Sequence, residues 1–314
     1  MKTLRMANTD LDVSRVALGC MRLREPARVI PAVRAALDSG INFFDHADIY
    51  GGGTSEDVFS AVWKEFPGLR ERVVVQSKCG IRNADTPTPG APRRFDFSYE
   101  HIVSSVEGSL RRLKTDHLDI LLLHRADPLV EPEEVARAFD DLRESGKVRF
   151  FGVSNHTGPQ IDLLRRYVGQ PLVANQLQLS VLHTALLDTG IVTNRYDPPT
   201  PVRGDGTLEY CRLHDITIQA WSPLAGGLIG RAGESAEERV RRTVALAGAL
   251  AEEKGVTPEA ILVAWVLRHP ARIQPIVGTT DPERIRACAQ ADDVALSREE
   301  WYRLFSAGRG RELP

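Results

Sequence analysis

Short apolar runs alternate with amphipathic stretches along most of the 314 residues. Runs such as ILLL at 120–123 are continuously apolar, which is typical of strands with both faces buried. The alternation of strands with helices predicts a parallel sheet built from βα units. Eight such runs predict strands, at 16–19, 42–45, 73–78, 118–124, 150–154, 173–178, 217–222 and 274–278.

Amphipathic helices are predicted between these strands. Glycines at positions 40 and 146 follow two of them, where a residue with positive φ commonly ends a helix. From Pro258 onward, Ala260, Ile261, Ala264 and Leu267 are expected to share one apolar face. A last helix exceeds the eighth βα unit and is expected outside the barrel. The helices are predicted at 31–39, 99–114, 133–145, from Pro258 onward, and from about Ser297, a plausible N-cap, through Phe305.

Eight strands favour a (β/α)8 TIM barrel, a single α/β domain over 1–314 with an extra C-terminal helix. The alternative, an open doubly wound sheet, would carry a GxGxxG motif after an early strand. The GGG at 51–53 lacks that spacing. Three strand-to-helix links are long, at 79–97, 180–206 and 223–237. In a barrel they lie on the C-terminal face, where active sites are built.

Polar residues stand where three neighbouring strands end. The second strand ends in Asp45 and is followed by Tyr50, the third ends in Lys78, and the fourth ends in His124. Each has a structural interpretation alone: an Asp can cap a helix, and a lone His can be a buried core residue. Their arrival at one rim favours a catalytic set instead.

This set suits carbonyl reduction, in which an alkoxide must be protonated as it forms. Lys78 beside Tyr50 would lower the pKa of the phenol and improve its acid–base function, while Asp45 would keep Lys78 charged. His124 could donate a hydrogen bond to the substrate oxygen. The flanking His46, Asp48 and Arg125 are expected to face the barrel wall or support the rim.

Composition and charge argue against several other classes of protein. The net charge of −2 argues against nucleic acid, and no apolar stretch is long enough for a membrane span or a signal peptide, so we expect a cytoplasmic protein. Four scattered cysteines, with no CxxC pair, predict reduced thiols. The histidines lack an HxH pair, so no metal is predicted and a metal-dependent barrel hydrolase is disfavoured. Oligomeric state is not predicted.

The sequence resembles the aldo-keto reductase family, in its bacterial oxidoreductase branch. The resemblance covers nearly the whole chain and implies that Asp45, Tyr50, Lys78 and His124 form the family's catalytic tetrad. The matching segments are ALGCM (17–21), NFFDHADIYGG (42–52), VVVQSKCGI (73–81), HLDILLLHRADP (117–128), GKVRFFGVSN (146–155), NQLQLS (175–180), AWSPLAGG (220–227) and PIVGTTDPERIRA (275–287).

The resemblance also implies a nicotinamide cofactor. Ser154, Asn155 and Gln176 match the residues that bind the carboxamide, and Trp221 matches the aromatic that stacks on the ring. Small residues let the backbone approach the pyrophosphate closely. The remaining positions implied along the cofactor are Gly19, Met21, Ser222, Leu224, Gly226 and Gly227.

The segment after the eighth strand implies NADP rather than NAD. Thr279, Thr280 and Arg284 match the family's 2′-phosphate site, and a guanidinium suits a phosphate. The chain departs from the pattern nearby. Gly278 stands where many reductases have Lys, Asp281 adds a negative charge, and Ala287–Cys288 replace a polar pair at the adenine.

The resulting expectation is an NADP(H)-dependent oxidoreductase that reduces small-molecule aldehydes or ketones to alcohols, with Tyr50 as general acid. The alternative is a nicotinamide-nucleotide-binding regulatory subunit with little turnover, which rests on fold analogy. The segment 194–206 is interpreted as an insertion that forms part of a substrate lid, and its Arg195 and Arg203 could attract an anionic group.

Overall fold

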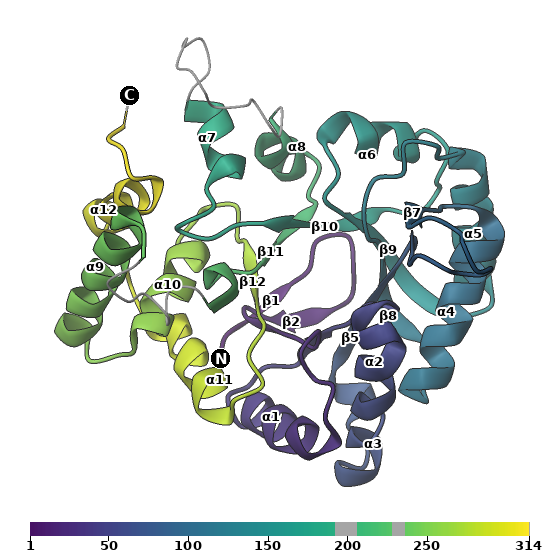
Figure 1. Cartoon of the computed structure of the whole chain (residues 1–314), viewed down its shortest axis with the longest axis horizontal. Coiled ribbons are helices and arrows are strands. Elements are labelled where there is room, and N and C mark those ends of the chain that lie inside the picture. Colours follow the sequence, from purple (N-terminus) through teal and green to yellow (C-terminus); the bar gives the residue numbers. More distant parts are fainter. Residues whose placement is uncertain (192–205, 228–235, 314) are drawn as a thin grey trace.

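Eight parallel strands close into a barrel and follow one another around it in chain order (Figure 1). The computed structural model describes residues 1–191, 206–227 and 236–313. The eight predicted strands are confirmed, with ends that differ by one or two residues. They are Ala17–Gly19 (β3), Phe43–Asp45 (β4), Val74–Cys79 (β5), Leu118–Leu123 (β8), Val148–Ser154 (β9), Leu172–Gln178 (β10), Thr217–Trp221 (β11) and Gln274–Val277 (β12).

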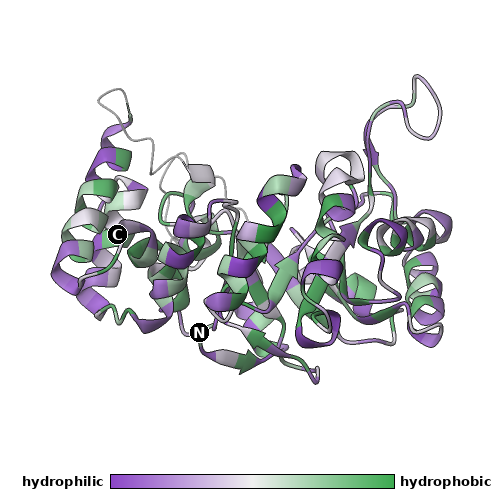
Figure 2. Ribbon diagram, turned by 90° about the horizontal axis from the view of Figure 1, so that it is seen from below, coloured by the Kyte–Doolittle hydropathy of each residue, from purple (hydrophilic) through white to green (hydrophobic). Residues whose placement is uncertain are grey.

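Helices surround this barrel (Figure 1). Figure 2 shows apolar residues concentrated at the strands and polar residues on the outward helix faces, as expected for a buried sheet. The helices are Pro26–Asp38 (α1), Thr54–Phe59 (α2), Val62–Glu65 (α3), Tyr99–Leu113 (α4), Pro132–Glu144 (α5), Gly158–Arg165 (α6), Ala185–Ile191 (α7), Thr207–Leu213 (α8), Glu238–Lys254 (α9), Pro258–Leu267 (α10), Pro282–Ala289 (α11) and Arg298–Arg309 (α12).

An antiparallel hairpin that the sequence pattern did not predict precedes the barrel. It consists of Thr3–Arg5 (β1) and Asp12–Ser14 (β2). Met6, Leu11 and Val13 are buried and pack in one cluster with apolar side chains of the barrel interior, including those of β4, β5 and β8. The hairpin therefore covers the N-terminal end of the barrel, opposite the rim on which the predicted site lies.

The first helix begins earlier than predicted. It starts at Pro26, which occupies the first turn after Glu25, so Pro31 lies inside the helix rather than near its start. A proline in the first turn costs little because its missing N–H would have no partner there. The expectation of a helix over 31–39 is therefore wrong in its N-terminal boundary.

Helix α10 is also more buried than predicted. Every residue from Ala260 to Leu267 is buried, rather than one face alone, because α10 lies between the barrel and the outer helices α9 and α12. The indoles of Trp265 and Trp301 stack with centroids 5.0 Å apart. Each indole Nε1 donates to the other residue's carbonyl oxygen, at 3.1 and 3.0 Å. The last helix is thus outside the barrel as predicted, and Ser297 caps it in a capping box with Glu300.

Candidate active site

The structure brings the four predicted catalytic residues together at the C-terminal rim. Asp45 ends β4, Lys78 lies near the end of β5, and His124 follows β8, while Tyr50 begins a 3₁₀ turn over Tyr50–Gly53. The Lys78 Nζ donates to the Asp45 Oδ2 at 2.8 Å and to the Tyr50 Oη at 3.0 Å. It donates a third hydrogen bond to the His46 carbonyl oxygen at 2.7 Å, so each of the three N–H groups of the ammonium has an acceptor.

Burial dominates the electrostatics of this group. The side chain of Lys78 is fully buried. Burial disfavours its charged form, but Asp45 and Tyr50 together hold the pKa of Lys78 above its ordinary value. Burial raises the pKa of Tyr50, and the nearby Lys78 ammonium offsets only part of that rise. The expected net lowering of the phenol pKa is therefore wrong: desolvation of the phenolate outweighs the ammonium.

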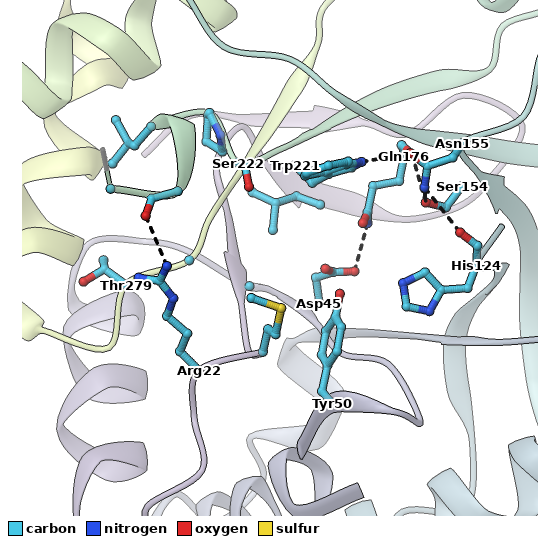
Figure 3. Close-up of a pocket in the computed structure, with 18 of the residues that line it drawn as sticks. Arg22, Asp45, Tyr50, His124, Ser154, Asn155, Gln176, Trp221, Ser222 and Thr279 are labelled. Atoms are coloured by element: carbon cyan, nitrogen blue, oxygen red, sulfur yellow. Dashed lines mark hydrogen bonds between the residues drawn. The ribbon is translucent and has the colours of Figure 1, made fainter. Parts of the chain in front are cut away.

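His124 is neutral in this environment. Burial, followed by the positive charges of Lys78, Arg125 and Arg93, lowers the pKa of His124 to about 2. Its ring lies edge-to-face with that of Tyr50, with centroids 5.9 Å apart (Figure 3). A neutral imidazole carries one N–H and can donate one hydrogen bond to a bound oxygen.

A chain of buried glutamines holds Asp45 from inside the barrel. The Nε2 atoms of Gln76 and Gln176 donate to the Asp45 Oδ1 at 2.6 and 3.0 Å. Both also donate to the Gln219 Oε1, and Gln219 donates to Gln274 at 3.0 Å. The last amide reaches the Ser14 carbonyl oxygen in β2 at 2.8 Å. Sequence reasoning identified only Gln176, because polar residues inside otherwise apolar strands gave no signal of their partners.

One pocket lies above the rim and contains most of the predicted site residues. Two predicted site residues, Lys78 and Thr280, do not line this pocket. Arg22, Arg125, Pro223 and Ile276 line the pocket without having been predicted as site residues. The predicted residues that line it are Gly19, Met21, Asp45, Tyr50, His124, Ser154, Asn155, Gln176, Trp221, Ser222, Leu224, Gly226, Gly227, Gly278, Thr279 and Arg284.

Trp221 presents a fixed aromatic surface to this pocket. Its Nε1 donates to the Asn155 Oδ1 at 3.1 Å (Figure 3). The Nδ2 of Asn155 donates to the Ser154 Oγ at 2.7 Å and to the His124 carbonyl oxygen at 3.3 Å. Asn155 adopts a φ of 59°, which asparagine tolerates better than most residues. Gln176 already uses its Nε2 within the glutamine chain, so its Oε1 is the atom left for a bound group.

The other end of the pocket carries two arginines and several glycines. The Nη2 of Arg22 donates to the Gly226 carbonyl oxygen at 3.2 Å and so joins the loops after β3 and β11 (Figure 3). Gly226 and Gly227 adopt positive φ angles of 68° and 82°. Arg284 lies 3.6 Å from Glu259, its ion-pair partner on α10. A Cβ at Gly278 would meet nothing within 4 Å, so this position has open space in front of it.

The loop and helix start after β12 are organised by Asp281. Its side chain caps α11 by accepting from the Glu283 N–H at 2.9 Å, and its own N–H donates to the Thr279 Oγ1 at 3.2 Å. This carboxylate therefore has a structural partner at the helix N-terminus, where negative charge is favourable.

His46, Asp48 and Arg125 flank the catalytic set, and the prediction for one of them is wrong. Arg125 lines the pocket, with its guanidinium carbon 5.8 Å from the centroid of the Trp221 ring, so the expectation that it faces the barrel wall or only supports the rim is wrong. His46 is fully buried against Phe59. Asp48 is half-buried: desolvation, with the charge of Glu56, raises its pKa to about 7.

The four cysteines are unpaired and buried, in agreement with the expected reduced thiols. Among the residues that the structure describes, His, Cys, Asp and Glu side chains form no cluster of three able to hold a metal ion. No helix in the described ranges is both long and apolar enough to cross a bilayer. The predicted lid segment 194–206, with Arg195 and Arg203, lies outside the described residues except for Gly206.

Comparisons with known proteins agree with this geometry. The model of the aldo/keto reductase family matches residues 15–308. The chain is 40% identical to the uncharacterized oxidoreductase YcsN of Bacillus subtilis over the full length of both chains. It is 37% identical to a 6-dehydroglucose reductase of Agrobacterium fabrum, over 98% of this chain and 99% of that one. The solved glycerol dehydrogenase AKR11B4 of Gluconobacter oxydans has the same fold, with a TM-score of 0.80 at 24% identity over 100% of this chain and 98% of that one.

Proposed function

We propose that this chain, which belongs to the aldo/keto reductase family, reduces small aldehydes or ketones with NADPH and uses Tyr50 as the proton donor. Family membership makes the chain an oxidoreductase. Carbonyl reduction with Tyr50 as the proton donor is supported by one observation. Hydrogen bonds run from Asp45 through Lys78 to Tyr50, and the His124 ring lies beside the phenol.

The pocket suits a dinucleotide. The Trp221 indole, held by Asn155, offers a flat surface for the nicotinamide, which would supply the hydride when bound. A Cβ at Gly19 would approach the Ile276 side chain to 2.9 Å, so only glycine leaves the existing space there. Positive charge from Arg22 at the other end favours the phosphates.

The proton is the part of the chemistry that the chain's own residues perform. Because burial raises the pKa of Tyr50, the phenol keeps its proton at neutral pH and can donate it to an oxygen that gains negative charge. Lys78 then stabilises the phenolate that remains, and Asp45 keeps the ammonium charged. The neutral His124 donates a hydrogen bond to the same oxygen and orients it.

The preference for NADP rests on Arg284 and Thr279, which line the pocket beyond the glycines. A guanidinium and a hydroxyl suit a 2′-phosphate better than a ribose hydroxyl. Arg284 is partly neutralised by Glu259, and Gly278 contributes no charge, so we expect the preference for NADPH over NADH to be modest.

The test is a screen in which oxidation of NADPH, and of NADH in parallel, is followed over a panel of aldehydes and ketones. Tyr50→Phe should abolish turnover and leave NADPH binding unchanged, as measured by quenching of tryptophan fluorescence. Tyr302→Phe, on the outer helix α12, is the matched control. Normal turnover by Tyr50→Phe would refute the proposed acid. Tight NADPH binding with negligible turnover on every carbonyl would favour the regulatory alternative.

A further inference from the structure

Arg125 places a positive charge beside the proposed reaction centre. It directly follows His124 and lines the same pocket. Its guanidinium lies over the Trp221 ring at a distance typical of cation–π contacts, while the residue remains exposed to solvent at the mouth of the pocket. Within the described ranges, the guanidinium has no hydrogen bond and no ion pair with an acidic side chain.

A second arginine, Arg93, comes from another loop. It lies in the hairpin formed by Ile81–Arg82 (β6) and Arg94–Phe95 (β7). Its neighbours are engaged: Arg82 pairs with Asp96, and Arg94 donates to loop carbonyl oxygens. Arg93 itself has no such partner among the described residues. Arg93 does not line the pocket, so the positive charge beside His124 at the pocket wall is that of Arg125.

Nearby acidic groups do not neutralise the charge of Arg125. The Asp127 carboxylate accepts from the backbone N–H groups of Phe97 and Leu129, which tie it to the loop. Asp45 is paired with Lys78. The cations at the other end of the pocket, Arg22 and Arg284, have a ligand in the phosphates of the proposed cofactor, whereas the positive charge beside His124 has none.

We propose that Arg125 forms a subsite for an anionic group on the substrate, in the first place a carboxylate. The inference rests on the proposed function and names its substrate class: small aldehydo or keto acids, whose carbonyl oxygen lies at Tyr50 and His124 while the acid group binds the guanidinium. A planar guanidinium binds a carboxylate through two parallel hydrogen bonds, which orients the substrate as well as attracting it.

The experiment compares matched aldehydes with the purified protein and NADPH. The pair is 4-carboxybenzaldehyde and its neutral methyl ester, with 4-formylphenyl phosphate as the third substrate. The wild type should prefer the carboxylate over the ester by at least about tenfold in kcat/KM. Arg125→Gln should lower kcat/KM for the carboxylate by about ten- to a hundredfold, mainly through KM, and leave the ester within about twofold.

Further variants separate this role from a structural one. Arg125→Lys should recover part of the preference, because the charge remains and the bidentate geometry is lost. Arg166→Gln, an exposed cation after α6, should change neither substrate. Rising salt should reduce the wild-type preference.

The outcomes distinguish failure of the proposed carbonyl reduction from failure of the proposed anionic subsite. If the wild type reduces none of the three aldehydes nor any other carbonyl, the proposed function fails. Equal use of acid and ester by the wild type, or an equal loss for both in Arg125→Gln, would overturn the anionic subsite while carbonyl reduction stands. A larger Arg125 dependence for the phosphate than for the carboxylate would overturn the assignment to carboxylates.

Discussion

The side-chain amide of Gln76 lies inside the barrel and donates a hydrogen bond of 2.6 Å to the Oδ1 of Asp45. The other oxygen of this carboxylate accepts from Lys78, whose ammonium in turn contacts Tyr50. The position of the proposed proton donor therefore depends on a residue that does not line the pocket. Such a residue positions the reactive groups without touching substrate.

Replacement of Gln76 tests this dependence. In Gln76→Leu the carboxylate loses one donor, which costs about 1.5–3 kcal/mol for a hydrogen bond to a charged group. We expect kcat to fall by about tenfold, with the Kd for NADPH unchanged and a shifted pH profile of kcat. Gln170→Leu, which removes a surface donor to Asp140, is the control. An unchanged kcat and pH profile would show that Lys78 alone suffices to hold Asp45.

The bridge from Arg22 to Gly226 predicts an effect on cofactor release. Arg22→Met removes the hydrogen bond that joins the two loops over the pocket, together with a charge near the phosphates. We expect NADPH to dissociate about tenfold faster in stopped-flow fluorescence. Arg24→Met should leave the rate unchanged, because among the described residues the Arg24 guanidinium donates only within its own loop, to the Met21 carbonyl oxygen. Equal acceleration in both variants would point to loop destabilisation instead.

The open space at Gly278 predicts a change in cofactor preference. A lysine fits there because no atom lies within 4 Å of an added Cβ, and its ammonium would extend the positive charge of Arg284. Gly278→Lys should lower the Kd of NADPH by about tenfold and leave that of NADH within about twofold, measured by fluorescence titration. Gly278→Met controls for the added side chain. Similar tightening for both cofactors would contradict a 2′-phosphate site at this end.

Asp48 predicts a pH dependence of stability. Its pKa is raised to about 7 by burial and by Glu56, so between about pH 4 and about pH 7 the folded chain holds a proton that the unfolded chain has released. The free energy of unfolding therefore falls as pH rises through this window. This carboxyl should contribute about 2–3 kcal/mol to the difference between about pH 5 and about pH 8.

Asp48→Asn should remove that contribution in urea unfolding, because an amide does not titrate. Asp57→Asn, an exposed carboxyl on α2, is the matched control and should leave the pH dependence as it is in the wild type. If Asp48→Asn and the wild type lose stability in parallel between these pH values, Asp48 is ionised in the folded chain at neutral pH.

The barrel could be predicted because its strands are buried on both faces and its predicted catalytic residues stand at strand ends. The β1–β2 hairpin escaped prediction because its strands are three residues long and partly exposed, which leaves too little periodicity to detect. The start of α1 was missed because either of two prolines could occupy a first turn, and the structure has Pro26 there.

Within the site, the residues at strand ends were identifiable and their partners were not. The hydrogen bonds of Gln76 and Gln219 join strands distant in sequence, so no local pattern reveals them. Arg22 and Arg125 lie in loops whose course depends on tertiary packing. The direction of the Tyr50 pKa shift depends on how completely the ring is buried, a quantity that only the folded structure supplies.

The hairpin at the N-terminal end of the barrel affects the order in which cofactor and substrate can bind. Met6, Leu11 and Val13 fill the N-terminal end, so reactants reach the rim residues from the opposite side of the molecule. A nicotinamide seated against Trp221 would occupy the deep part of that entrance. Binding would then be ordered: the dinucleotide would enter before the carbonyl substrate and leave after the alcohol product, and excess alcohol bound beside NADPH would form a dead-end complex.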